Sequence, residues 1–174
     1  MVEGIGPISL SKPASRLSLR MREGDIAAVS AAAGMRFDMP VNRWIGQRNG
    51  MTGRLGPDEW LLIGVEADLE AVTSELNAAL SGCPSSIVDV SHRQVGFEIA
   101  GPHAEAILNS GCPLDLRPSA APAGFATRTL LGKAEITLFR LEGPTAFRAE
   151  SWRSFSTYVH GFLLEAARDC LSGD

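Results

Sequence analysis

The spacing of hydrophobic and polar residues changes several times along the chain, and each spacing predicts a particular element. Apolar and polar residues alternate through Arg16-Leu-Ser-Leu-Arg-Met21, which puts the three apolar side chains on one face of a half-buried strand. From residue 69 to residue 80, apolar residues recur at helical spacing behind Asp68, a candidate N-cap. The continuous apolar run Trp60-Leu-Leu-Ile-Gly-Val65 predicts a strand that is covered on both faces.

Turn and cap residues divide the rest of the N-terminal half. An alanine-rich segment predicts a helix that begins near Asp25 and stops at Gly34, because glycine tolerates the left-handed conformation that follows a helix end. Asn49-Gly50 is a strong two-residue hairpin signal, and it places strands at residues 43–48 and 51–55.

The middle of the chain predicts a second hairpin and a third helix. We expect residues 86–90 to pair with residues 95–100, and Pro102 suits the first turn of the helix that follows. Two helices end in the same tetrapeptide, at Ser81-Gly-Cys-Pro84 and at Ser110-Gly-Cys-Pro113. Glycine supplies a positive φ and proline cannot continue a helix, so shared stop chemistry explains the repeat, and four residues cannot establish a duplication.

Three antiparallel strands and a closing helix are predicted for the C-terminal part. Turns at Gly132-Lys133 and at Gly143-Pro144 separate the strands. The strands are expected at residues 125–131, 134–141 and 145–151. The final helix follows Ser154 as its cap, and its apolar stripe starts with Phe155 and Tyr158.

The order of these elements predicts an α+β fold of mainly antiparallel sheets with helices packed on one face. A chain of 174 residues fits a single domain, 1–174, or two small and intimately packed halves. Residues 114–124 include Pro118, Pro122 and Gly124 and read as a connecting loop. They are the best candidate for a junction between the halves.

Composition narrows the classes of function. Apolar residues make up 45% of the chain and charged residues 21%, which is ordinary for a globular protein. A net charge of -4 gives no basis for binding nucleic acid. Residues 1–7 lack the charge pattern of a signal peptide, and no uncharged run is long enough to span a membrane. Three dispersed cysteines suggest no disulfide framework, so we expect a cytoplasmic protein with neither nucleic acid nor membrane as partner.

The residues offer few catalytic candidates. Asp89, Ser91 and His92 are the residue types of a hydrolytic triad, but on a strand His92 would point away from the other two, which favours a local turn. The adjacent acids Asp58 and Glu59 follow Gly-Pro, and turn chemistry explains them better than acid–base catalysis does.

Metal and cofactor sites are not predicted for this chain. The three histidines are dispersed without ligand spacing, at His92, His103 and His160. The glycines between residues 46 and 56 do not form the fingerprint of a dinucleotide-binding loop between a strand and a helix.

Arginine and tryptophan, which are enriched at protein interfaces, gather in two stretches of the sequence. Arg36, Arg43, Arg48 and Arg54 flank Trp44, and the second stretch holds Arg128, Lys133, Trp152 and Arg153. The alternative for each single residue is a solvated surface charge. The predicted partner interface comprises Arg128, Lys133, Trp152, Arg153, Trp44 and Arg48.

Two longer segments resemble a family signature: Arg54-Leu-Gly-Pro-Asp-Glu-Trp-Leu-Leu62 and Asp89-Val-Ser-His-Arg-Gln-Val-Gly-Phe-Glu-Ile-Ala-Gly-Pro102. Together with residues 126–135 and 152–155, in the same order, they are similar to the gamma subunit of heterotetrameric sarcosine oxidase. The resemblance covers residues 10–167. It implies a fold like the folate-binding region of the glycine-cleavage T-protein.

The resemblance also implies a function for the whole assembly. Such complexes demethylate sarcosine oxidatively to glycine, with formation of hydrogen peroxide and methylene-tetrahydrofolate. The gamma chain would be a non-catalytic assembly subunit whose partners are the alpha, beta and delta subunits. FAD, FMN, NAD and tetrahydrofolate would bind in those other subunits, and no cofactor would bind this chain.

One residue supports an alternative. The segment Glu135-Ile-Thr-Leu-Phe-Arg140 resembles the T-protein strand that begins near a catalytic aspartate, and Glu135 stands near the place of that aspartate. The longer side chain displaces the carboxylate, which argues against the same proton transfer. A stand-alone folate-dependent aminomethyltransferase that uses Glu135 is the alternative function. A general scaffold with changed partners is the third.

Overall fold

The computed structural model describes residues 7–47, 50–64, 68–143 and 145–172, and the chain divides into two compact units. Unit 2 runs from Pro13 to His92, and unit 1 joins the segment that ends at Lys12 with everything from Arg93 onward. Each unit has one five-stranded antiparallel sheet with helices packed on one face, which makes the fold α+β, as predicted. Residues 114–124 lie inside unit 1, and the chain changes unit at residues 12–13 and 92–93.

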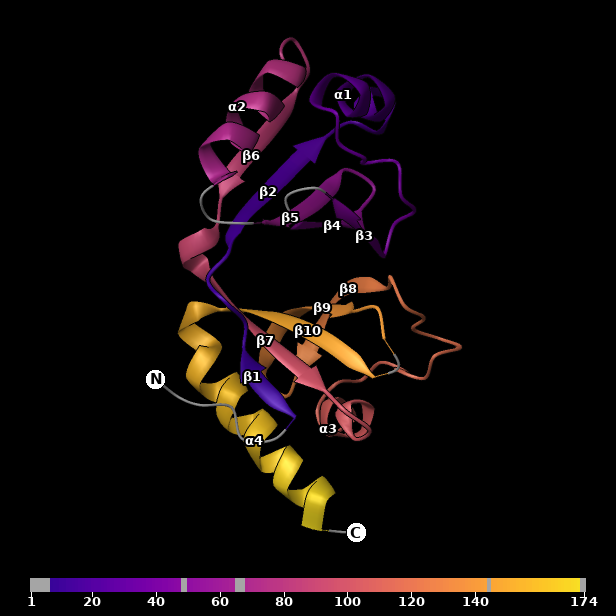
Figure 1. The fold of residues 1–174 in the computed structure, drawn as a ribbon, viewed down its shortest axis with the longest axis vertical. Coiled ribbons are helices and arrows are strands. Elements are labelled where there is room, and N and C mark those ends of the chain that lie inside the picture. Colours follow the sequence, from indigo (N-terminus) through magenta and orange to yellow (C-terminus); the bar gives the residue numbers. More distant parts are fainter. Residues whose placement is uncertain (1–6, 48–49, 65–67, 144, 173–174) are drawn as a thin grey trace. The chain divides into compact units, whose positions relative to one another are not determined.

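Unit 2 has the strand order β3-β4-β5-β2-β6, with α1 and α2 beside the sheet (Figure 1). Its apolar core joins Leu19 of the central strand β2 and Trp60 of β5 to Val29 and Leu76 of the two helices. Alternation along β2 and helical spacing along α2 point these side chains into one core. The elements are β2 (Ser15–Met21), η1 (Glu23–Asp25), α1 (Ile26–Ala33), β3 (Arg43–Gln47), β4 (Gly50–Gly56), β5 (Glu59–Gly64), α2 (Leu69–Ala79) and β6 (Ser85–Asp89).

Local signals predicted most of unit 2 correctly. Helix α1 ends at Gly34, whose φ of 61° is the left-handed conformation that the glycine was expected to supply. Strands β3 and β4 pair as an antiparallel hairpin, with Arg43 opposite Arg54. Asn49, the first residue of the predicted hairpin turn, lies outside the described residues. Strand β5 is buried from Glu59 to Ile63, in agreement with a strand covered on both faces.

Unit 1 has the strand order β1-β7-β10-β9-β8, with all neighbouring strands antiparallel. The three predicted C-terminal strands are confirmed as β8, β9 and β10. The elements are β1 (Ile8–Leu10), η3 (Ser91–Arg93) at the junction, β7 (Gln94–Ala100), α3 (Ala104–Asn109), β8 (Ala126–Leu131), β9 (Ala134–Arg140), β10 (Ala146–Trp152), η4 (Arg153–Phe155) and α4 (Ser156–Ser172).

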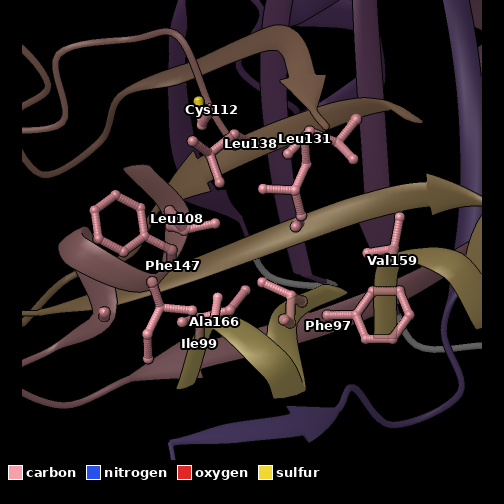
Figure 2. Packing of buried hydrophobic residues seen from close by; sticks show 14 of the residues in the cluster. Phe97, Ile99, Leu108, Cys112, Leu131, Leu138, Phe147, Val159 and Ala166 are labelled. Carbon is pink, nitrogen blue, oxygen red and sulfur yellow. The ribbon is translucent and has the colours of Figure 1, made fainter. Parts of the chain in front are cut away.

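The core of unit 1 lies between this sheet and the helices α3 and α4 (Figure 2). Phe97, Leu138 and Phe147 come from adjacent strands, and Leu108 and Val159 come from the two helices. All five side chains are fully buried. Burial of each large apolar side chain is worth about 1.5–3 kcal/mol, so this cluster is the main source of stability in unit 1.

The predicted hairpin between residues 86–90 and 95–100 is wrong. Strand β6 pairs with β2 in the sheet of unit 2, whereas β7 pairs with β10 and β1 in the sheet of unit 1. The two strands follow each other in the sequence but are separated by the 3-10 turn Ser91–Arg93, where the chain passes from one unit to the other. Their apolar patterns fit a hairpin, but both edges of β7 are occupied by β1 and β10, and β6 pairs with β2 instead.

The two units repeat one topology. In unit 2 the order β2-α1-β3-β4-β5-α2 is followed by the edge strand β6, and in unit 1 the order β7-α3-β8-β9-β10-α4 is completed by β1 from the start of the chain. The repeated Ser-Gly-Cys-Pro tetrapeptides follow α2 and α3, which are not equivalent helices in this repeat. The tetrapeptides therefore reflect stop chemistry, and the topological repeat is independent of them.

None of the helices in the described part of the chain has the length and apolar character that crossing a membrane requires.

Candidate interaction surface

Arg54, one of the arginines around Trp44 in the sequence, is buried and structural. Its guanidinium donates to the carbonyl oxygens of Met39 at 3.2 Å and Pro57 at 2.7 Å, and to Glu23 Oε1 at 2.9 Å. It also lies 5.1 Å from the ring centroid of Trp60, in a cation–π contact. Arg54 therefore ties the loop after α1 to the sheet and presents no surface to a partner.

The other described residues of the first stretch differ in their exposure. Arg36 is exposed and pairs with Asp38, and Arg43 and Trp44 are half-buried on the edge strand β3. Arg48 lies outside the described residues. The interface role of Trp44 and Arg48 stays a prediction.

Three of the four residues of the second stretch lie at one end of the unit 1 sheet. Trp152 ends β10, Arg153 opens the turn η4, and Lys133 lies in the turn between β8 and β9. The hydroxyl oxygen of Tyr158 accepts a hydrogen bond of 3.0 Å from the backbone N–H of Lys133, which joins this hairpin to the start of α4. We name this set the Trp152 surface, and it comprises Arg93, Lys133, Trp152, Arg153, Phe155 and Tyr158.

Three aromatic side chains of the Trp152 surface are exposed. Trp152 is 41% exposed, Phe155 43% and Tyr158 38%. Phe155 and Tyr158 open the predicted apolar stripe of the last helix, but burial along that stripe begins with Val159. Phe155 ends the turn η4, and Tyr158 lies in the first turn of α4.

Arg93 joins this surface from a distant part of the sequence. Its guanidinium carbon lies 4.4 Å from the centroid of the Trp152 ring, a close cation–π contact. The pairing of β7 with β10 produces this contact, because Gln94 lies directly opposite Trp152. Sequence reasoning missed Arg93 because no local pattern links it to Trp152.

Arg128 and Glu135 lie on β8 and β9, on the sheet face opposite the core. The two side chains are about half exposed, and Arg128 Nε lies 3.9 Å from Glu135 Oε1, a weak surface ion pair. Ala134 and Ile136, the neighbours of Glu135, point into the core instead. Proton transfer by Glu135 would take place on this exposed face, beside the charge of Arg128.

The Asp89-Ser91-His92 cluster is a turn. Asp89 Oδ1 accepts hydrogen bonds from the Ser91 hydroxyl at 2.5 Å and from the Ser91 N–H at 2.8 Å, and these hydrogen bonds hold the pKa of the Asp89 carboxyl below its ordinary value. Ser91 Oγ in turn accepts from the backbone N–H of Arg16 at 2.8 Å. The serine hydroxyl therefore donates to the acid itself, in a local turn of unit 2.

The predicted turn role of Asp58 and Glu59 agrees with their contacts. Both carboxylates lie 3.1 Å from the guanidinium of Arg20 on the neighbouring strand. The pair thus fixes the entry to β5 by ion pairing.

Within the described residues there is no cluster of three or more histidine, cysteine or acidic side chains that could hold a metal ion. A hollow in unit 2, lined in part by Leu17, Thr52, Leu62 and Leu69, has an inner space of about 30 Å³.

Comparison with known proteins points to one family. A family model described as "Sarcosine oxidase, gamma subunit family" matches residues 23–169. A sarcosine oxidase subunit gamma of Arthrobacter sp. is 36% identical over 115 residues, which are 66% of this chain and 56% of that subunit. The chain thus spans little more than half the length of that relative.

Two solved structures show the fold. A chain of the heterotetrameric sarcosine oxidase from Corynebacterium sp. U-96 matches with a TM-score of 0.84 and 28% identity, covering 93% of this chain and 83% of that one. The glycine cleavage system aminomethyltransferase T from Bartonella henselae matches with a TM-score of 0.70 and 14% identity, covering 92% of this chain and 46% of that one, which shows the fold alone. The expected resemblance to the T-protein fold is therefore confirmed, and the chain belongs to the sarcosine oxidase gamma subunit family.

Proposed function

We propose that this chain is the non-catalytic gamma subunit of a heterotetrameric sarcosine oxidase, assembled in the cytoplasm with alpha, beta and delta subunits. The observation that carries the proposal is the match to a chain of the heterotetrameric enzyme over 93% of this sequence. In that assembly sarcosine would be demethylated to glycine, with formation of hydrogen peroxide and methylene-tetrahydrofolate. The chain itself would contribute binding surface.

The chemistry of that reaction would belong to the partner subunits. FAD, FMN and NAD would carry the electrons there, and tetrahydrofolate would accept the one-carbon unit, because a cofactor supplies the reactive group and the protein around it supplies orientation. On this chain the charged side chains that are most buried serve the fold. Arg54 and Arg140 hold loop carbonyl oxygens, and Arg148 Nε donates to Glu150 at 2.7 Å.

A folate-dependent aminomethyltransferase is the second candidate, and Glu135 is the residue that favours it. Glu135 stands at the second position of β9 in a fold like that of the T-protein. Its half-exposed carboxylate and the adjacent Arg128 resemble a solvated surface pair more than a general base, which is ordinarily set in a desolvated cleft.

Co-expression with the larger sarcosine oxidase subunits of the same organism tests the first proposal. We expect one complex on size-exclusion chromatography, with sarcosine-dependent formation of hydrogen peroxide. Elution of this chain apart from the other subunits would overturn the proposal.

Thermal unfolding with tetrahydrofolate tests the second candidate, because a ligand that binds only the folded state raises Tm. For a binding-only subunit we expect no shift. A saturable rise in Tm, abolished by Glu135→Gln, would instead favour the aminomethyltransferase.

A further inference from the structure

The Trp152 surface combines exposed aromatic rings, side chains held in place by neighbouring contacts, and cationic residues. We propose that it is the docking site for a partner subunit. This inference rests on the proposed function and adds to it the place of contact and the chemistry of the partner. The partner segment that docks here carries carboxylates set among apolar side chains.

The first argument is the exposure of large rings. Trp152, Phe155 and Tyr158 lie close together in the sequence, at the end of β10, in η4 and at the start of α4. Each exposes more than a third of its surface. Single exposed apolar residues are normal, but several exposed aromatic side chains in one short segment are typical of a contact site. Tryptophan and tyrosine are the residue types that most often dominate binding energy in interfaces.

The second argument is that the surface is already fixed in place. The register of β10 with β7 holds the backbone of Trp152, and Arg93 stacks on its ring. Tyr158 is held by its hydrogen bond from Lys133 and packs with Phe162, at a distance of 6.2 Å between ring centroids. A surface ordered before binding loses little conformational entropy when a partner docks.

The third argument is charge. Arg93 and Lys133 are exposed, and each contacts one of these rings, Arg93 through its guanidinium and Lys133 through its backbone N–H, in a chain whose net charge is -4. Exposed cationic side chains beside aromatic rings on an acidic protein favour a partner surface of the opposite sign, since charge complementarity speeds encounter and fixes register. Arginine also binds carboxylates in a bidentate manner.

Other exposed apolar residues lack this combination and provide matched controls. Leu171 lies at the far end of α4 and is 51% exposed. Arg168, on the same helix, is an exposed arginine paired with Glu165. Neither residue belongs to the Trp152 surface. Substitution of Leu171 therefore controls for the loss of an exposed apolar side chain, and substitution of Arg168 controls for the loss of an exposed positive charge.

The test measures the affinity of the purified chain for the co-expressed larger subunits of the same oxidase. We expect Trp152→Ala to weaken binding on the order of 30-fold, as truncation of a central aromatic residue does. The double change Arg93→Glu with Lys133→Glu should weaken it by a similar factor, and more strongly at low salt. Leu171→Ala and Arg168→Glu should stay within about threefold of the unaltered chain.

The possible results of this experiment test the docking site and the proposed function separately. Binding by the unaltered chain, with both surface variants as tight as the two controls, would overturn the docking site and leave the proposed function standing. No binding by the unaltered chain would overturn the proposed function itself. Self-association of the isolated chain that Trp152→Ala abolishes would overturn the assignment of the occupant, because a second copy would then cover the surface. Circular dichroism of each variant checks that the fold is intact.

Discussion

In each unit, a buried arginine donates a hydrogen bond to a backbone carbonyl oxygen in a long loop between a helix and a strand. In unit 2 the loop between α1 and β3 is long, and Arg54 at the end of β4 donates to Met39 O within it. In unit 1 the loop between α3 and β8 is longer still, and Arg140 at the end of β9 donates to Leu116 O within it at 2.7 Å. A buried guanidinium satisfies carbonyl oxygens that would otherwise lack partners.

The match between the two arginines extends to their surroundings. Arg54 lies directly opposite Trp60 across β4 and β5, and Arg140 lies directly opposite Phe147 across β9 and β10. Each guanidinium lies over that ring, at 5.1 Å and 4.9 Å from the centroid. The repeated topology thus carries a repeated stabilising contact at equivalent positions.

Two tryptophans, one from each unit, differ in their exposure. The tryptophan of β5, Trp60, is fully buried, whereas the tryptophan of β10, Trp152, is 41% exposed and carries an arginine on its ring. The two units therefore share their strand topology and the arginine that holds the loop between helix and strand. The aromatic and basic Trp152 surface has no counterpart in this shared framework, and it is the site that we propose for partner binding.

The largest expected effect is on the buried tryptophan. Trp60→Ala should lower the free energy of unfolding of unit 2 by about 3–5 kcal/mol, because it leaves a cavity and removes the hydrogen bond from Trp60 Nε1 to Phe37 O. Urea denaturation followed by circular dichroism measures this loss. A loss below about 1 kcal/mol would show that Trp60 does not anchor the core.

The two arginines offer the sharpest test of equivalence. Arg54→Met and Arg140→Met should each cost about 2–4 kcal/mol, because each leaves buried carbonyl oxygens without donors while keeping much of the side-chain volume. Hydrogen exchange in the two loops would show which unit loosens in each variant. An appreciable loss in one variant and none in the other would mean that the arginines share geometry without sharing a role.

Trp152→Ala should have a much smaller effect on folding than on binding. Because Trp152 is 41% exposed, we expect the free energy of unfolding to fall by less than about 1 kcal/mol. Denaturation midpoints of the isolated chain measure this. A loss as large as that of Trp60→Ala would identify Trp152 as a core residue and would remove the contrast between the two tryptophans.

The smallest effect concerns the turn at the junction. Hydrogen bonds from Ser91 lower the pKa of Asp89 in the folded state, so the ionised carboxylate favours folding above its unfolded pKa of about 3.9. This contribution is lost as the pH falls through the lower folded pKa. Asp89→Asn should therefore cost about 0.5 kcal/mol at neutral pH and less at an acidic pH below the unfolded pKa. Urea midpoints at the two pH values measure the difference, and an equal cost at both would contradict it.

Local chemistry in the sequence determined most of the elements. Gly34 ended α1 because its left-handed φ suits glycine, and alternation along β2 set which side chains face the core. The three strands of residues 126–152 were predicted within one or two residues, because glycine turns separate them. The segments Arg54–Leu62 and Asp89–Pro102 also pointed to the family.

Tertiary structure alone decided which strands pair and which side chains are covered. The periodicity of β6 and β7 defines a face for each strand but not a partner edge, because every strand edge offers the same backbone donors and acceptors. For the same reason the sequence could not show that Arg54 is buried against Trp60 whereas Arg93 stacks on an exposed ring. Burial depends on what the rest of the chain places over a residue, and that information is not local.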